Sequence, residues 1–272
     1  MNGWVMPVTL AATLAGCGSS TGGALVTFHA EAAGPTDAVA GQPLVFSTAP
    51  RDANNNVTQY QVTLTRAVLH IGAIYLNHAV PISGAQPTSC ILPGIYVGEV
   101  LTALDVDTLS PDPQPFASEG VGTSLQALTG EVWLTGGDIN ARDDSTVIAD
   151  VAGTATQGST TYPFTGQITI GANRAAAQSP PFPNQHPLCR QRIVSPIDLR
   201  SQDLSLAQGG TLLVRVDPRL WFAAVDFAQL PVDTNDPAGR RFLDANDNSP
   251  DIALYSGVRA ATGVYSFKWQ SP

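Results

Sequence analysis

Lysine and methionine are almost absent from this 272-residue chain, and only three cysteines occur. Lys268 is the single lysine, and the formal net charge is −9. Because phosphate binding needs clustered basic side chains, this balance disfavours nucleic acid as a partner. The two methionines, Met1 and Met6, both precede residue 17. A thioether copper(I) site is therefore excluded from the rest of the chain.

Short catalytic motifs are also missing. The sequence contains no Gly-x-Ser-x-Gly, no His-Glu-x-x-His, no P-loop and no Gly-x-Gly-x-x-Gly that opens a helix. These absences favour a binding protein over an enzyme. A Ser-His-Asp triad is still compatible with the sequence, because its members need not be neighbours along the chain. A hydrolase with an unrecognised site therefore stays open as an alternative.

The beginning of the chain has the features of a secretory signal. An apolar run over residues 8–16 ends in small residues, and it is too short to span a bilayer. The four residues Leu14-Ala15-Gly16-Cys17 resemble the lipobox of bacterial lipoproteins. The resemblance implies that residues 1–16 are a signal peptide and that Cys17 is acylated after cleavage. The leader departs from the pattern in having no basic residue near Met1, and a chance match in a secreted or cytosolic chain is the alternative.

The residues after Cys17 bear on location. Gly18 and Ser19 stand where an inner-membrane retention signal usually has Asp, which favours the outer membrane of a bacterial cell envelope. Residues 17–23 are predicted to be an acylated cysteine followed by a flexible tether. The partner at this end is then the membrane itself, through the lipid anchor.

Short alternating runs separated by turn residues dominate the sequence after residue 23. They predict an all-β fold, an antiparallel β-sandwich with elaborated loops, with residues 24–272 as one domain. Two smaller domains are the alternative. One short helix is expected near residues 219–230, with Asp217 as its N-cap and Pro218 in its first turn. The run at 59–76 is long and is expected to bend near Gly72. The expected strands cover residues 24–31, 43–49, 59–76, 95–106, 124–134, 146–156, 161–171, 191–199, 211–217, 253–259 and 263–269.

Cys90 and Cys189 remain once Cys17 is set aside. Two cysteines in an oxidising compartment are expected to form a disulfide. A site with two thiolate ligands for a metal is the alternative.

Two groups of residues are candidate metal ligands. His29 and Glu31 are two positions apart and are expected to share the outer face of one strand, while His70 lies near the end of the long strand. Imidazole and carboxylate ligands would suit copper. The segment 244–248 has oxygen-bearing side chains at alternate positions, which is the spacing of calcium loops, although it departs from an EF-hand further on. Its candidate ligands are Asp244, Asn246 and Asn248.

Three segments follow one another in an order that is similar to the strand order of the MbnP-like periplasmic copper-binding proteins. These segments are residues 26–30, residues 62–76, and Arg215-Val-Asp-Pro followed by Trp221-Phe222. The resemblance implies a β-sandwich that works with a di-haem partner, and it assigns no ligand.

The sequence therefore predicts a lipid-anchored, non-catalytic binding or scaffold lipoprotein of the bacterial cell envelope. Its partner beyond the membrane would be an envelope protein or a small ligand. A periplasmic lipoprotein that binds copper or calcium is the second hypothesis, and the hydrolase is the third.

Overall fold

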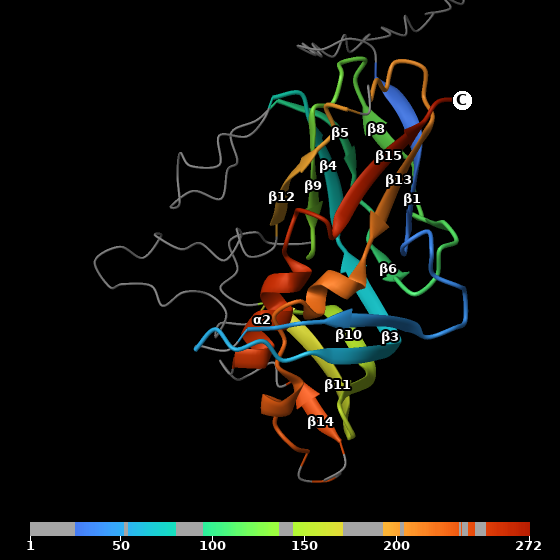
Figure 1. Ribbon diagram of the computed structural model, residues 1–272. Coiled ribbons are helices and arrows are strands. Elements are labelled where there is room, and N and C mark those ends of the chain that lie inside the picture. The colour runs from blue at the N-terminus through green and yellow to red at the C-terminus, as the bar shows by residue number, and fades with distance from the viewer. Residues whose placement is uncertain are drawn as a thin grey trace, which may run out of the picture.

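The computed structural model describes residues 25–51, 54–79, 95–135, 144–170, 193–201, 204–233, 235, 239–242 and 249–272. Cys17, Cys90 and Cys189 lie outside these residues, as do Asp244, Asn246 and Asn248, so the lipid anchor, the disulfide and the calcium loop stay predictions. In the described part of the chain, the strands form two sheets (Figure 1). The expected all-β, sandwich-like fold is confirmed.

The upper sheet in Figure 1 has nine strands in the order β12-β9-β4-β5-β8-β1-β13-β15, and β7 pairs with β1 beside this path. Strands β12 and β15, at opposite ends of this order, lie close together, so the sheet curls around its own apolar side chains. The strands are β1 (Val26–Ala33), β4 (Ala73–Asn77), β5 (Tyr96–Val100), β7 (Gln114–Pro115), β8 (Gly120–Gly122), β9 (Thr129–Trp133), β12 (Ile193–Asp198), β13 (Thr211–Val216) and β15 (Tyr265–Gln270).

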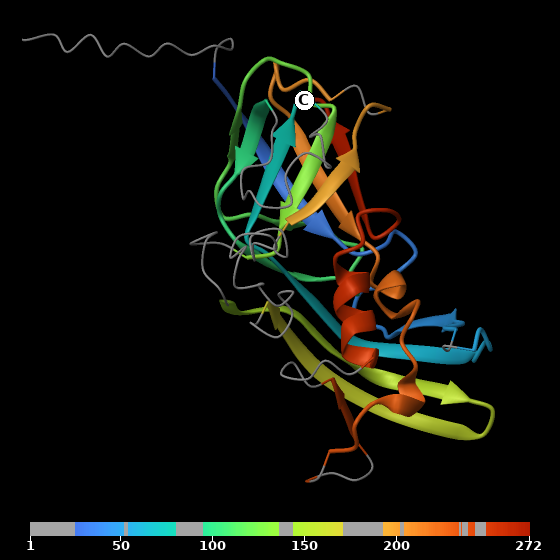
Figure 2. The same cartoon turned by 90° about the vertical axis from the view of Figure 1, so that its left-hand side faces the viewer.

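The lower sheet has six strands in the order β14-β11-β10-β3-β2, and β6 pairs with β3 beside this path. Helix α2 (Ser249–Val258) lies over one face of this sheet (Figure 2). In the same view, β10 and β11 are the strands of the sheet that lie farther from the nine-stranded sheet than β2 and β3 do. The strands are β2 (Leu44–Thr48), β3 (Tyr60–Ile71), β6 (Leu104–Asp107), β10 (Asp144–Gln157), β11 (Thr160–Ile170) and β14 (Arg240–Phe242).

Gly72 joins the two sheets. Strand β3 belongs to the six-stranded sheet and ends at Ile71, and β4 starts at Ala73 in the nine-stranded sheet. The Gly72 amide donates a hydrogen bond of 2.7 Å to the carbonyl oxygen of Trp133 in β9, which fixes the point where the chain passes from one sheet to the other. The expected bend of the long strand is confirmed.

The sheets are mixed, which corrects the expectation of purely antiparallel pairing. Strand β1 pairs with β13 in parallel, and β11 pairs with β14 in parallel. The remaining pairs between described strands are antiparallel. A parallel pair needs a long connection between its two strands, so neighbouring strands that are far apart in sequence are part of this topology.

The helical segments differ from the expectation. Asp217 does act as an N-cap, because its side chain accepts a hydrogen bond from the Arg219 amide, and Pro218 follows it. The segment 219–230 nevertheless forms two short 3₁₀ helices, η1 (Pro218–Phe222) and η2 (Phe227–Gln229), separated by a turn. The only α-helix in the described residues is α2, at a place where the sequence pattern predicted a strand over 253–259, and that prediction is wrong.

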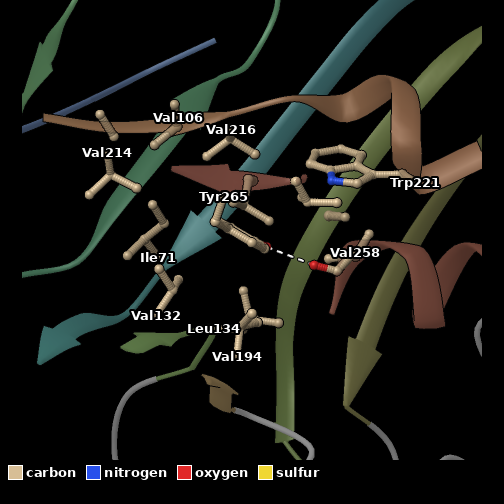
Figure 3. Packing of buried hydrophobic residues seen from close by; sticks show 14 of the residues in the cluster. Ile71, Val106, Val132, Leu134, Val194, Val214, Val216, Trp221, Val258 and Tyr265 are labelled. Carbon is tan, nitrogen blue, oxygen red and sulfur yellow. Dashed lines mark hydrogen bonds between the residues drawn. The ribbon is translucent and has the colours of Figure 1, made fainter. Parts of the chain in front are cut away.

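A continuous apolar core runs through both sheets. Figure 3 shows Ile71, Val132, Val214 and Tyr265 packed together, although they come from β3, β9, β13 and β15. The Tyr265 hydroxyl donates a hydrogen bond of 2.7 Å to the carbonyl oxygen of Val258 in α2. This bond satisfies a buried hydroxyl and ties the C-terminal strand to the helix.

Candidate functional site

The two metal candidates on β1 face outward, as expected. The burial of β1 alternates, so Phe28 and Ala30 lie in the core while His29 and Glu31 point away from it. The side chain of His29 is 69% exposed, and its Nδ1 lies 3.6 Å from Oε1 of Glu119. The geometry of β1 is therefore confirmed, while the proposed metal role of these residues stays a prediction.

His70 lies in the other sheet. Its Nδ1 is 2.6 Å from Oδ1 of Asp105, its register partner on β6, so the carboxylate orients the imidazole ring. The structure therefore does not bring His29 and His70 into one site. Within the described ranges, no three side chains of His, Cys, Asp or Glu are grouped so that they could hold a metal ion.

A polar surface covers the outer face of the six-stranded sheet, on the side away from α2. Strands β3, β10 and β11 alternate between core residues and short polar residues on this face. Because directly opposed residues share a face, the register gives successive cross-strand rows. One row contains Ser47, Gln61, Thr156 and Thr161. Another contains Arg66, Ala152, Thr165 and Arg241.

A β-bulge directs Arg66 onto this face. The pairing of β3 with β10 shifts between Ala152 and Gly153, and Thr65 and Arg66 are therefore both exposed although they are consecutive. An extra residue in one strand reverses the alternation of side chains beyond it. Without this bulge the register would aim Arg66 toward the apolar core.

Arg66 and Arg241 flank a surface hollow of about 470 Å³, which we call the arginine hollow. Their Cα atoms are separated by three strand spacings, or about 14 Å. The small side chains of Ala152 and Thr165 lie between them in the same row. The residues that line the hollow are Arg66, Val147, Thr165, Gly166, Gln167, Thr169, Arg241 and Phe242.

Each arginine of the hollow is held by a carboxylate. Arg66 donates from Nε to Oδ1 of Asp150 at 2.9 Å, and its Nη2 lies 2.8 Å from the same oxygen. The other oxygen of Asp150 accepts a hydrogen bond of 3.2 Å from Nε2 of Gln167. The Asp150 carboxylate thus fixes the orientation of two donors that border the hollow.

The second pair is formed by Arg241 and Asp233, with 2.5 Å between Nε and Oδ2. The backbone amide of Asn235 and the Arg241 guanidinium hold the pKa of the Asp233 carboxyl below its usual range, so the pair stays ionised at neutral pH. The Asp233 side chain is only 8% exposed, whereas that of Arg241 is 55% exposed. The guanidinium therefore presents its remaining N–H groups to solvent.

The two ion pairs, Arg66 with Asp150 and Arg241 with Asp233, carry no net charge. The hollow offers guanidinium and amide donors beside hydroxyl and amide acceptors, within a chain whose net charge is −9. The carboxylates of Asp150 and Asp233 are occupied by the two arginines and do not line the hollow. Exposed Val147 adds an apolar contact at the edge. This arrangement suits a neutral ligand rich in hydroxyl groups, because each hydroxyl both donates and accepts hydrogen bonds.

A separate polar cluster is buried in the nine-stranded sheet. Glu131 of β9 is fully buried, and its carboxylate accepts hydrogen bonds of 3.1 Å from Nδ2 of Asn77 and 3.1 Å from Nε1 of Trp133. The Ser195 hydroxyl of β12 lies 3.4 Å away as a further donor. Burial raises the pKa of Glu131, and the hydrogen bonds from these donors oppose part of the rise. The cluster links β4, β9 and β12, and we assign it a structural role.

The arginine hollow has no counterpart among the residues selected from sequence. Its members are spread from residue 66 to residue 242, and no local motif connects them. The available signal was the threonine and glutamine content of the alternating runs, such as Gln61-Val62-Thr63 and Gln167-Ile168-Thr169. That pattern reveals a polar face but does not show which strands share it.

None of the helices in the ranges given above is both long and apolar enough to cross a membrane. Neither a protein-family model, nor a curated protein, nor a solved structure matches this chain.

Proposed function

We propose that this protein is a lipid-anchored, non-catalytic binding lipoprotein of the bacterial cell envelope, and that its arginine hollow binds a neutral saccharide. The observation that carries the proposal is the neutral array of donors and acceptors around Arg66 and Arg241. An anionic ligand would compete with Asp150 and Asp233 for the guanidinium groups and would be repelled by the net charge of the chain.

The position of β1 supports an orientation in which the lipid anchor and the arginine hollow lie at opposite ends of the molecule. The start of this strand lies at the end of the molecule opposite the six-stranded sheet in both views (Figures 1 and 2). Only eight residues separate Cys17 from Val26. A lipid on Cys17 would therefore hold the nine-stranded sheet near the membrane and leave the arginine hollow directed away from it.

Binding is tested by probing an array of neutral and acidic glycans with the labelled chain from residue 18 onward. Arg66→Gln and Arg241→Gln should each weaken retention of the bound glycan, because each removes donors at one side of the hollow. Arg200→Gln is the matched control, because Arg200 pairs with Asp198 on the other sheet and is 65% exposed. Retention of no glycan, or an equal loss in the control, would overturn the saccharide proposal.

Anchoring is tested separately by metabolic labelling with palmitate. The full-length chain should incorporate the label, and Cys17→Ser should abolish incorporation while leaving the fold intact. An unlabelled wild-type chain would exclude the lipid anchor without affecting the glycan experiment.

A further inference from the structure

A second hollow adjoins the arginine hollow. It has a volume of about 360 Å³, and we call it the Asp107 hollow. Arg66 lines both hollows. The Asp107 hollow is otherwise formed by Thr65 and Val68 of β3, by Asp107 of β6, and by the turn that contains Gln42, together with neighbouring residues.

The two hollows follow one line across the sheet. The arginine hollow lies over β14, β11 and β10, and Arg66 stands on β3, the next strand. The Asp107 hollow continues on the other side of Arg66, where Val68 of β3 is the register partner of Asp107 of β6. The line is therefore perpendicular to the strands and runs from Arg241 to Asp107.

The Asp107 hollow also combines polar and apolar groups. Asp107 Oδ1 accepts the Leu109 amide at 3.0 Å, which holds the carboxylate at the rim. The Thr65 hydroxyl donates to the carbonyl oxygen of Ala152 at 3.1 Å and keeps its lone pairs for a ligand. The exposed Gln42 adds an amide, and Val68 forms an apolar part of the wall.

We infer that the ligand is an extended neutral saccharide chain that occupies both hollows and crosses Arg66. The inference rests on the proposed function and deepens it. A single sugar ring is too short to reach both hollows, whereas a chain makes contacts in both. Because the second contact is made within the same complex, it benefits from a high effective concentration, and affinity should rise with chain length.

The test uses two series of oligosaccharides, maltose-type and chitin-type, each from one to six units, titrated into the chain from residue 18 onward by calorimetry. In the series that binds, we expect affinity to rise roughly a hundredfold or more as the chain becomes long enough to reach the second hollow, and then to level off.

Gln42→Trp fills the Asp107 hollow with a bulky side chain. It should remove the rise with chain length, so that long and short oligomers bind with similar affinity. Gln208→Trp is the matched control, because Gln208 is an exposed turn residue next to the nine-stranded sheet. Arg241→Gln should instead weaken binding at every length.

The outcomes separate the two proposals. Binding that is independent of chain length, or a rise that persists in Gln42→Trp, overturns the two-hollow inference and leaves a single saccharide site. Absence of binding at every length in both series, together with a blank glycan array, overturns the inference and the saccharide function together.

Discussion

Glu131 makes the stability of the protein dependent on pH in a direction that the structure specifies. Its carboxyl is fully buried on β9, and burial raises its pKa. Well below about pH 4.3 the group is protonated in both the folded and the unfolded chain, so it has no effect on stability there. As the pH rises past about 4.3, the usual value for glutamate, the unfolded chain ionises first and folding becomes less favourable. The loss stops once the pH exceeds the pKa in the folded protein.

Two substitutions separate this effect from the loss of hydrogen bonds. Glu131→Ala leaves Nδ2 of Asn77 and Nε1 of Trp133 without their acceptor. At about 1–3 kcal/mol for each orphaned donor, the expected loss is about 2–6 kcal/mol. Glu131→Gln keeps one acceptor and never ionises. As the pH rises, the free energy of unfolding of Glu131→Gln should therefore increase relative to that of the wild type. The total increase is about 1.4 kcal/mol for each pH unit by which folding raises the pKa of Glu131.

The assay is urea unfolding followed by tryptophan fluorescence, at intervals from pH 4 to pH 9 and constant ionic strength. Glu99→Gln controls for the removal of one negative charge on the same sheet. If the difference between Glu131→Gln and wild type stays constant with pH, or falls as the pH rises, the reasoning about the buried carboxyl is refuted.

Three further measurements test the core, a helix cap and the disulfide. Phe164→Ala should cost about 3–5 kcal/mol in urea unfolding, because the ring is buried against Phe227 at 5.0 Å between centroids; a loss below about 1 kcal/mol would contradict this packing. Asp217→Ala should cost about 1 kcal/mol by loss of the N-cap, read from the unfolding midpoint, and a neutral result would mean that the cap contributes nothing. Thiol titration of the denatured chain from residue 18 onward, without reductant, should find neither Cys90 nor Cys189 free; two reactive thiols would exclude the bridge.

Much of the strand pattern can be predicted from the sequence, because the alternation of polar and apolar residues is a local property. The outward direction of His29 and Glu31 follows from it, as does the bend at Gly72 between β3 and β4. The cap at Asp217 is equally local, since it depends on one side chain and the amide two residues later.

Helix α2 shows where prediction from local alternation fails. The residues 253–259 read as a strand, but they are preceded by Ser249-Pro250-Asp251, a typical start of a helix. The strand prediction rested on the apolar pattern of residues 253–259 alone and missed this local signal. Packing then decides the outcome, because Gly257 lies against the backbone of Trp221, where a Cβ atom would come within 2.3 Å of the Trp221 carbonyl oxygen.

The candidate site belongs almost entirely to the tertiary structure. The sequence by itself determined that the chain would form short strands with polar outer faces, because those faces follow the two-residue repeat of a strand. Only the folded chain decided that Arg66 and Arg241 share a row, since a bulge in β3 and the parallel pairing of β14 with β11 set that register. Cross-strand register depends on contacts between segments far apart in the sequence, such as Arg66 with Ala152 and Thr165 with Arg241, and no local pattern encodes it.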